Sequence, residues 1–139
     1  AAAYLRKCGV DIIRVKKWFQ SDLISFNKIA AIVKSAEIVN GSVAIAINPK
    51  REKDTSIVCA KAADELLTIS DITASFVLGD MGDKVCISGR SIGDVNVQVI
   101  LEKLGGGGHI TLAGAQVEGK DIEEVKGELI GCIAEYFSG

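Results

Sequence analysis

Hydrophobic residues recur at helical spacing in the first quarter of the chain. Residues 1–9 are typical of the last turns of a helix, as though the chain continued a larger protein. Between residues 11 and 35 the apolar positions recur three or four residues apart, which predicts two further helices. We therefore expect residues 1–35 to form a helical connector and residues 36–139 to form a separate domain.

The apolar pattern then changes to strand spacing. Two apolar runs flank Asn40-Gly41, a dipeptide that is strongly favoured in tight hairpins. The run over residues 43–47 is apolar at every position, so we expect both of its faces to be covered. A second pair of alternating runs, over residues 73–79 and 84–91, flanks another turn and predicts a second hairpin.

Helical spacing returns in three further segments. The first covers residues 55–67, with Ile57 among its inward-facing positions. The second, residues 95–104, also alternates like a strand, but its apolar spacing and the glycine after it favour a helix capped by Asp94. The third begins at Asp121. Its apolar stripe comprises Ile122, Val125, Leu129, Ile133 and Phe137.

Together with a short strand over residues 116–118, these elements predict an α/β fold. We expect a mixed sheet of about five strands with helices on both faces, preceded by the connector helices. The glycine-rich loop after residue 104 should lie at one edge of this sheet.

Four consecutive glycines, Gly105, Gly106, Gly107 and Gly108, precede His109, the single histidine of the chain. Each glycine loses more backbone freedom on folding than any other residue. Three explanations stay open: a flexible linker, a helix stop combined with a packing turn, and a cradle of backbone N–H groups for an anion. The apolar flanks of the run are not typical of a linker.

Arg90 stands where a predicted strand ends, between Ser88 and Ser91. A guanidinium with two nearby hydroxyls suits a phosphate, although an ordinary surface arginine is equally consistent with the sequence. A single helix separates this strand end from the glycine run. We therefore expect Arg90 and His109 to reach the same end of the sheet and to share one anion site.

Composition and charge narrow the class of protein. The formal charge is −2, from 18 acidic and 16 basic residues, so we expect no general attraction to a polyanion. The four cysteines, Cys8, Cys59, Cys86 and Cys132, are widely spread, which argues against a zinc site or a disulfide scaffold. We expect them to be buried, reduced thiols. Since no run is long enough to span a membrane, we expect a cytoplasmic domain.

Several motifs occur in a fixed order: Ser88-Gly89-Arg90-Ser91, Asn96-Val97, the glycine-histidine run and Ala113-Gly114-Ala115. This composite resembles the C-terminal substrate-binding domain of the DHH phosphoesterase superfamily, and it looks closest to cyclic-di-AMP phosphodiesterases of the GdpP type. The resemblance extends back through residues 62–67 and the Trp18-Phe19 connector. One departure is Leu112, where related members usually carry alanine or asparagine.

The resemblance implies a domain that closes over a separate catalytic DHH domain, where aspartates and histidines hold two manganese ions. It implies no catalytic residue, metal or cofactor in this chain. One histidine cannot furnish the ligands of a two-metal site, so we expect the chain to be the recognition half of a hydrolase and inactive when isolated. The implied substrate-binding residues are Ser88, Arg90, Ser91, Asn96, Gly105, Gly106, Gly107, Gly108 and His109.

The implied partners are a cyclic dinucleotide or short oligonucleotide, the DHH domain of the same parent chain, and a second copy in a homodimer. The parent protein would be anchored in the membrane, with no membrane contact by this fragment. Two alternatives stay open. One is a nano-RNase that degrades short oligonucleotides and 3′,5′-bisphosphate nucleotides. The other is a nucleic-acid-binding module, like the related domains of alanyl-tRNA synthetases and exonucleases. Such a module would have a basic face, which the even spread of Lys and Arg does not favour.

Overall fold

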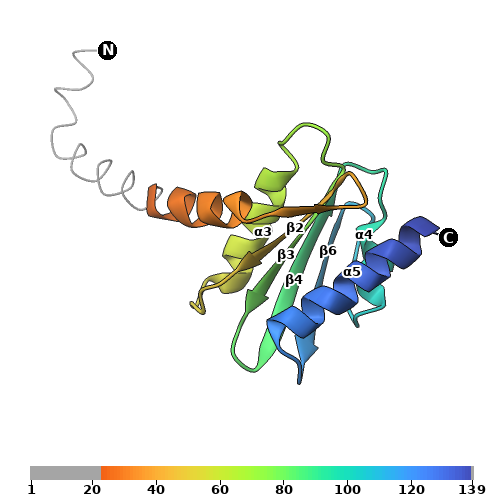
Figure 1. Ribbon diagram of the computed structural model, residues 1–139. Helices are drawn as coiled ribbons and strands as arrows, with labels where there is room; N and C mark the ends of the chain where they lie inside the picture. The colour runs from red at the N-terminus through yellow and green to blue at the C-terminus, as the bar shows by residue number, and fades with distance from the viewer. Residues whose placement is uncertain (1–22, 139) are drawn as a thin grey trace, which may run out of the picture.

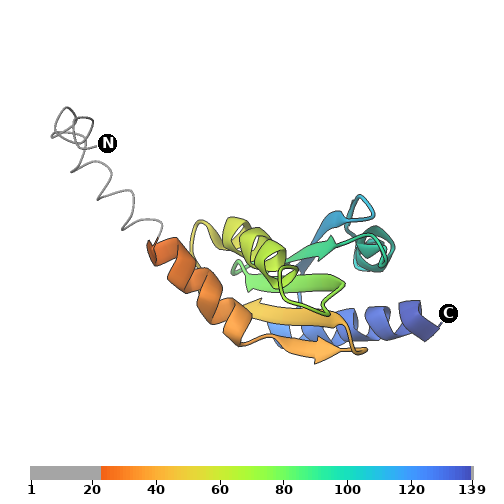
Figure 2. The same ribbon diagram turned by 90° about the horizontal axis from the view of Figure 1, so that it is seen from above.

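The structure, a computed structural model, describes residues 23–138. A helix over residues 23–34 leads into one mixed sheet (Figures 1 and 2). Its first turns carry exposed apolar side chains, such as Phe26 at 62% exposure, whereas Ile32 near its end is 2% exposed. The helix therefore joins the domain through its C-terminal half. Trp18 and Phe19, part of the expected connector, lie outside the described residues.

Six strands form the sheet in the order β1-β2-β3-β4-β6-β5. β2 and β3 are parallel and are joined through a helix, while the other neighbouring strands pair antiparallel. The expected mixed sheet is confirmed, with β5 as a sixth strand at the edge. The strands are β1 (Glu37–Val39), β2 (Val43–Asn48), β3 (Ala74–Asp80), β4 (Lys84–Ser91), β5 (Gly107–Gly108) and β6 (Leu112–Glu118); the helices are α3 (Thr55–Leu66), α4 (Val97–Glu102) and α5 (Ile122–Ser138).

Both predicted hairpins are present. Between β1 and β2, Asn40 and Gly41 have φ angles of 51° and 81°, the left-handed conformation that a tight hairpin turn requires. Between β3 and β4, the Asp80 carboxylate accepts the Gly82 N–H at 2.8 Å and pairs with Arg51 at 2.9 Å. The Gly82 N–H, and after it the Arg51 guanidinium, lower the pKa of Asp80.

Helices cover both faces of the sheet, as Figure 2 shows edge-on. One core lies between the sheet and α4 with α5, and it includes Phe76, Ile87, Leu101, Leu129 and Ile133. The other core lies between the sheet and α3 with helix 23–34, and it includes Ala44, Val77, Cys86, Ala62 and Leu66. β2 contributes side chains to both cores, which confirms the expectation that both of its faces are covered.

The segment that alternated like a strand is a helix, as predicted, but it begins two residues later than its expected cap. Asn96, not Asp94, is the N-cap of α4, and its side-chain oxygen accepts the Val99 N–H at 3.1 Å. The reason is burial: Val95 and Val97, on either side of Asn96, are 2% and 0% exposed, and residues 92–95 form bends rather than a helical turn. Asp121 caps α5 as predicted, through the Glu124 N–H at 2.8 Å.

Two apolar side chains were predicted to face inward and do not. Ile57 is 58% exposed, because α3 turns Val58 and Cys59 toward the sheet instead. Phe137 is 42% exposed in the last turn of α5, where its ring packs edge-on against Tyr136 with a centroid distance of 5.3 Å. Phe137 lies beyond Ile133, the last buried residue of α5.

Candidate functional site

One part of the sheet has no helix above it. On the side of α3, this helix packs over β2, β3 and β4, but the outer strands β6 and β5 extend beyond it. Side chains of β6 alternate strictly: Ala113 and Ala115 are buried against α4 and α5, whereas Leu112, Gly114 and Gln116 are exposed on the other side. We call this bare surface over β6 and β5, together with Ser88 and Arg90 of the neighbouring β4, the open face.

The register of the strands sets two neighbouring rows across the open face. In the first row, Ser88 of β4 lies opposite Gly114 of β6, which lies opposite Gly107 of β5. In the second row, Arg90 lies opposite Leu112. Residues that face each other across strands project to the same side of the sheet, so the rows form one surface. Its floor is bare at the two glycines, and its margins are polar and apolar side chains.

Arg90 reaches the open face from β4 and is held there by two contacts. Its Nε–H donates to the Asp64 carboxylate of α3 at 2.9 Å, and Nη1 donates to the Gly89 carbonyl at 2.8 Å. Only 12% of the Arg90 side chain is exposed, so packing restricts it further. The contact joins residues that lie 26 positions apart in the sequence, so only the structure brings Asp64 to Arg90.

His109 follows β5 and is exposed at the same end of the sheet. Its backbone N–H donates to the Leu112 carbonyl at 2.7 Å, which places it beside Leu112 on the side away from Arg90. Two strand spacings of about 5 Å then separate the backbones of Arg90 and His109 by roughly 10 Å. The two residues therefore lie at one end of the sheet, with Leu112, 51% exposed, between them.

Three of the four glycines have a structural reason within the domain. Gly105, at φ 85°, ends α4: its N–H bonds to Glu102 and the N–H of Gly106 bonds to Leu101, the pattern of a Schellman cap. A Cβ on Gly106 would lie 2.2 Å from the Gly114 carbonyl oxygen, and one on Gly108 would lie 2.5 Å from that of Leu112. Thus much of the run is a helix stop and a packing turn.

Gly107 differs from its neighbours. A Cβ built on it meets no atom within 4 Å, and its φ angle lies outside the left-handed region. Nothing in the described fold requires glycine there, and its bare side looks onto the open face opposite Gly114. The Gly106 N–H already donates to the Leu101 carbonyl. The anion cradle that the glycine run suggested therefore lacks this donor.

Two residues of the sequence-predicted site do not reach the open face. Ser91 projects to the opposite side of β4 from Arg90, is 6% exposed, and accepts the Gly93 N–H at 2.8 Å. The side chain of Asn96 caps α4, and the backbone N–H of Asn96 donates to the Tyr136 hydroxyl at 3.0 Å. Strict alternation explains Ser91, and the helix start explains Asn96. The expected pair of hydroxyls around Arg90 is thus reduced to Ser88.

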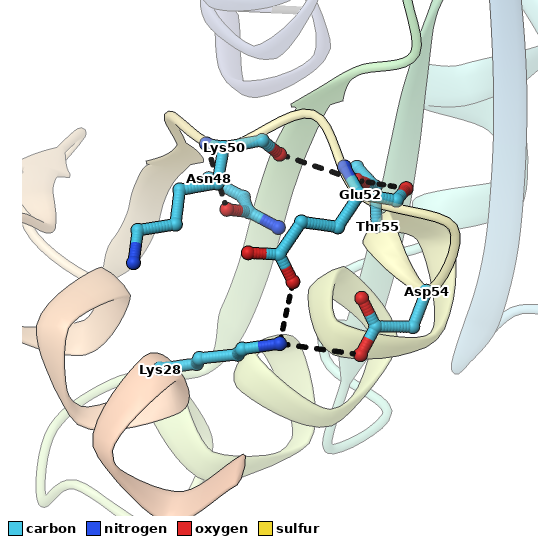
Figure 3. A network of polar contacts seen from close by, with 6 residues as sticks. All are labelled: Lys28, Asn48, Lys50, Glu52, Asp54 and Thr55. Atoms are coloured by element: carbon cyan, nitrogen blue, oxygen red, sulfur yellow. Dashed lines mark hydrogen bonds and ion pairs between the residues drawn. The ribbon is translucent and has the colours of Figure 1, made fainter. Parts of the chain in front are cut away.

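A separate pocket of about 270 Å³ lies on the same face of the sheet but near β2, between helix 23–34 and the segment after β2. Its rim carries an ion-pair network, in which Lys28 contacts Glu52 at 2.5 Å and Asp54 at 3.6 Å (Figure 3). These contacts, that with Glu52 first, raise the pKa of Lys28. Lys28 of helix 23–34 is paired with two carboxylates of the segment before α3, and the pocket lies near β2, away from the open face. We therefore assign the network to fastening helix 23–34 to the domain.

Other candidate chemistry within residues 23–138 is absent or structural. No three His, Cys, Asp or Glu side chains in this range gather closely enough to hold a metal ion. Cys59 and Cys86 are buried free thiols whose mutual hydrogen bond, together with burial, raises the pKa of Cys59. Cys132 is a free, half-buried thiol, and Cys8 lies outside the described residues. No helix in this range has the length and apolarity to cross a membrane.

The fold is an α/β domain whose mixed sheet is left partly uncovered beside an arginine that is largely shielded from solvent. Residues 39–135 match the family model of the DHHA1 domain, and the chain belongs to this family.

Similar proteins place the chain within that family. It is 43% identical to the cyclic-di-AMP phosphodiesterase GdpP of Geobacillus thermodenitrificans and 41% identical to the cyclic-di-AMP phosphodiesterase PdeA of Listeria monocytogenes. Both alignments cover 100% of this chain but 21% of the relative, so the chain spans about a fifth of their length. An exopolyphosphatase-related protein from Bacteroides fragilis shares the fold, with a TM-score of 0.68 and 19% identity over 81% of this chain and 34% of its own.

Proposed function

We propose that this chain is the substrate-binding domain of a cyclic-di-AMP phosphodiesterase. In this proposal a separate DHH domain of the same parent protein holds two manganese ions and performs the hydrolysis. The open face faces that domain and binds the substrate. The observation that supports this most is the open face itself, where Arg90 borders a floor formed by Gly107 and Gly114.

In this proposal, different parts of the open face bind different parts of a nucleotide. Arg90 offers charge-assisted hydrogen bonds to a phosphate, and its restricted side chain loses little freedom on binding. The exposed imidazole of His109 can donate to a phosphate oxygen from the other side of Leu112. The bare floor at Gly107 and Gly114, in the row beside Leu112, admits a flat group close to the backbone, as a nucleobase requires.

Parallel titrations test the choice of ligand. We expect the chain to bind cyclic-di-AMP more tightly than its linear dinucleotide product and more tightly than a short single-stranded RNA, measured by calorimetry at one salt concentration. Preference for the linear dinucleotide would instead indicate a nano-RNase type of substrate. Preference for the RNA, with a strong salt dependence, would indicate a nucleic-acid-binding module.

Substitutions of the two cationic residues test the site. In the full-length parent enzyme, Arg90→Ala should cost on the order of 2 to 4 kcal/mol of transition-state stabilisation, and His109→Ala a similar amount. The measurement is kcat/KM for cyclic-di-AMP hydrolysis. Lys50→Ala, on the loop after β2, is the matched control because it removes one positive charge far from the open face. An unchanged kcat/KM for Arg90→Ala would remove the open face from the proposal.

A further inference from the structure

The contact between α3 and the open face is made by Asp64, a residue without a role in the proposed substrate binding. Asp64 lies on α3, and its carboxylate accepts the Nε–H of Arg90 at 2.9 Å. The residues around it in α3, Ala62, Ala63 and Leu66, are at most 1% exposed and pack against the sheet. They hold the helix in place without Asp64.

The ion pair contributes little to stability. The Asp64 side chain is 64% exposed, and ion pairs exposed to that degree contribute about 0 to 1 kcal/mol. The Arg90 side chain is only 12% exposed, so the acidic partner lies in water while the basic partner lies in the protein. This asymmetry favours a role in directing the guanidinium over a role in holding α3.

The contact leaves most of the guanidinium free for a ligand. Arginine carries five N–H donors, and the two recorded bonds use one on Nε and one on Nη1. Three donors therefore remain, two on Nη2 and one on Nη1. Because the guanidinium is planar and rigid, fixing Nε against Asp64 and Nη1 against the Gly89 carbonyl also fixes the direction of the remaining donors.

We propose that Asp64 is a positioning residue, which fixes the guanidinium of Arg90 so that its three remaining N–H donors meet a phosphate at the open face. This inference rests on the proposed function, because it needs a phosphate-bearing ligand there. The opposite role is that the Asp64 carboxylate competes with the phosphate for Arg90. The two roles predict opposite changes of affinity when the carboxylate is removed.

Asp64→Ala tests the inference, with cyclic-di-AMP as the probe. We expect its affinity to fall about tenfold, the equivalent of one charge-assisted hydrogen bond. Asp64→Glu should restore part of the loss, because it returns a carboxylate to the same helix face. Glu65→Ala is the control, since it removes the same charge from the next residue of α3, and its affinity should stay within about twofold. In an Arg90→Ala background, Asp64→Ala should have no further effect.

A second measurement needs no ligand. The Nε–H resonance of Arg90 should be protected from solvent exchange in the unmodified chain and in Glu65→Ala, and lose that protection in Asp64→Ala while the backbone spectrum is retained. Tighter binding by Asp64→Ala, or unchanged binding together with an unchanged Arg90 resonance, would overturn the inference. If Arg90→Ala weakens binding while Asp64→Ala does not, the inference fails and the proposed function stands. If no variant and no unmodified chain binds the probe, the proposed function fails, and the resonance alone decides whether Asp64 orders Arg90.

Discussion

Two missing side chains, at Gly107 and Gly114, give the open face its character at the residue scale. Gly107 and Gly114 face each other on β5 and β6, so two adjoining strands expose backbone where side chains would otherwise stand. A ligand that lies there contacts peptide groups directly, and its edges meet Ser88, Arg90 and Leu112. Recognition then depends on shape at the floor and on charge at the margin.

Gly107→Val separates binding from folding. Because nothing lies within 4 Å of a Cβ at this position, we expect the free energy of unfolding to change by less than about 1 kcal/mol. Binding of cyclic-di-AMP should be strongly impaired, because the isopropyl group stands on the floor of the open face. Thermal denaturation and calorimetry on the same preparation measure both effects.

Gly106→Ala is the matched control for that variant. Its Cβ would lie 2.2 Å from the Gly114 carbonyl oxygen, so the backbone must move and stability should fall by several kcal/mol. If Gly107→Val destabilised the domain as much as Gly106→Ala, the loop would be a packing turn throughout.

At the scale of elements, α4 connects the core to the glycine loop. Its first turn is capped by Asn96, its buried face carries Val97, Ile100 and Leu101, and its last turn ends in the Gly105 cap. The N-terminus of α4 also binds the turn before β6, where the Val97 N–H donates to the Ile110 carbonyl at 3.0 Å. The helix thereby sets the positions of both sides of the loop that carries His109.

Substitution of Asn96 tests whether its side chain acts as a cap or as a ligand. Asn96→Ala should cost about 1 kcal/mol in the free energy of unfolding, because the Val99 N–H loses its acceptor. Asn96→Asp should recover most of that stability, because aspartate caps equally well. Chemical denaturation measures these changes. A loss of ligand affinity in the Ala variant without any loss of stability would assign Asn96 to the substrate instead.

The elements themselves were largely predictable, because they follow from local spacing. The Asn40-Gly41 turn, the fully apolar run of β2 and the helical spacing of Val97, Ile100 and Leu101 each determine a structure within a few residues. What stayed beyond reach was the position of the α4 cap, because Asp94 and Asn96 are both good caps and only the burial of Val95 decides between them.

The candidate site was predictable only in part. Arg90 and His109 were expected at one end of the sheet, and the register confirms that placement. The prediction that Ser91 lies beside the Arg90 side chain was wrong, because adjacent residues of a strand face opposite sides. This rule could have been applied to the sequence once β4 was assigned. Asp64 was missed for a different reason: its contact with Arg90 spans 26 positions and depends on how α3 crosses the sheet.

On the scale of the whole molecule, the domain leaves one face of its sheet partly uncovered and offers no metal-binding cluster within residues 23–138. The relatives are about five times longer, since the chain covers 21% of each. Most of each relative therefore lies outside the region that this chain matches. If hydrolysis belongs to another part of the parent protein, as proposed, the chain by itself should be inactive.

We expect the purified chain to hydrolyse no phosphodiester, even with added manganese. Two-metal hydrolysis needs several carboxylate and imidazole ligands around adjacent ions, and the chain contains a single histidine. The measurement is product release from cyclic-di-AMP, by chromatography, with and without manganese. Turnover that a chelator abolishes and that persists through stringent purification would contradict the expectation, and mixing with a separately expressed DHH domain is the positive control.

The short pairing of β5 has a thermodynamic consequence. β5 pairs with β6 at two positions, Gly107 and Gly108, with one further bond from the His109 N–H to the Leu112 carbonyl, whereas β4 and β6 pair over seven positions. The loop can therefore detach in a local opening that costs far less than unfolding the domain. A ligand that contacts both Arg90 and the loop binds only the closed form, so its apparent affinity is reduced by the closed fraction. Variants that close this edge in advance would tighten binding without adding a contact to the ligand.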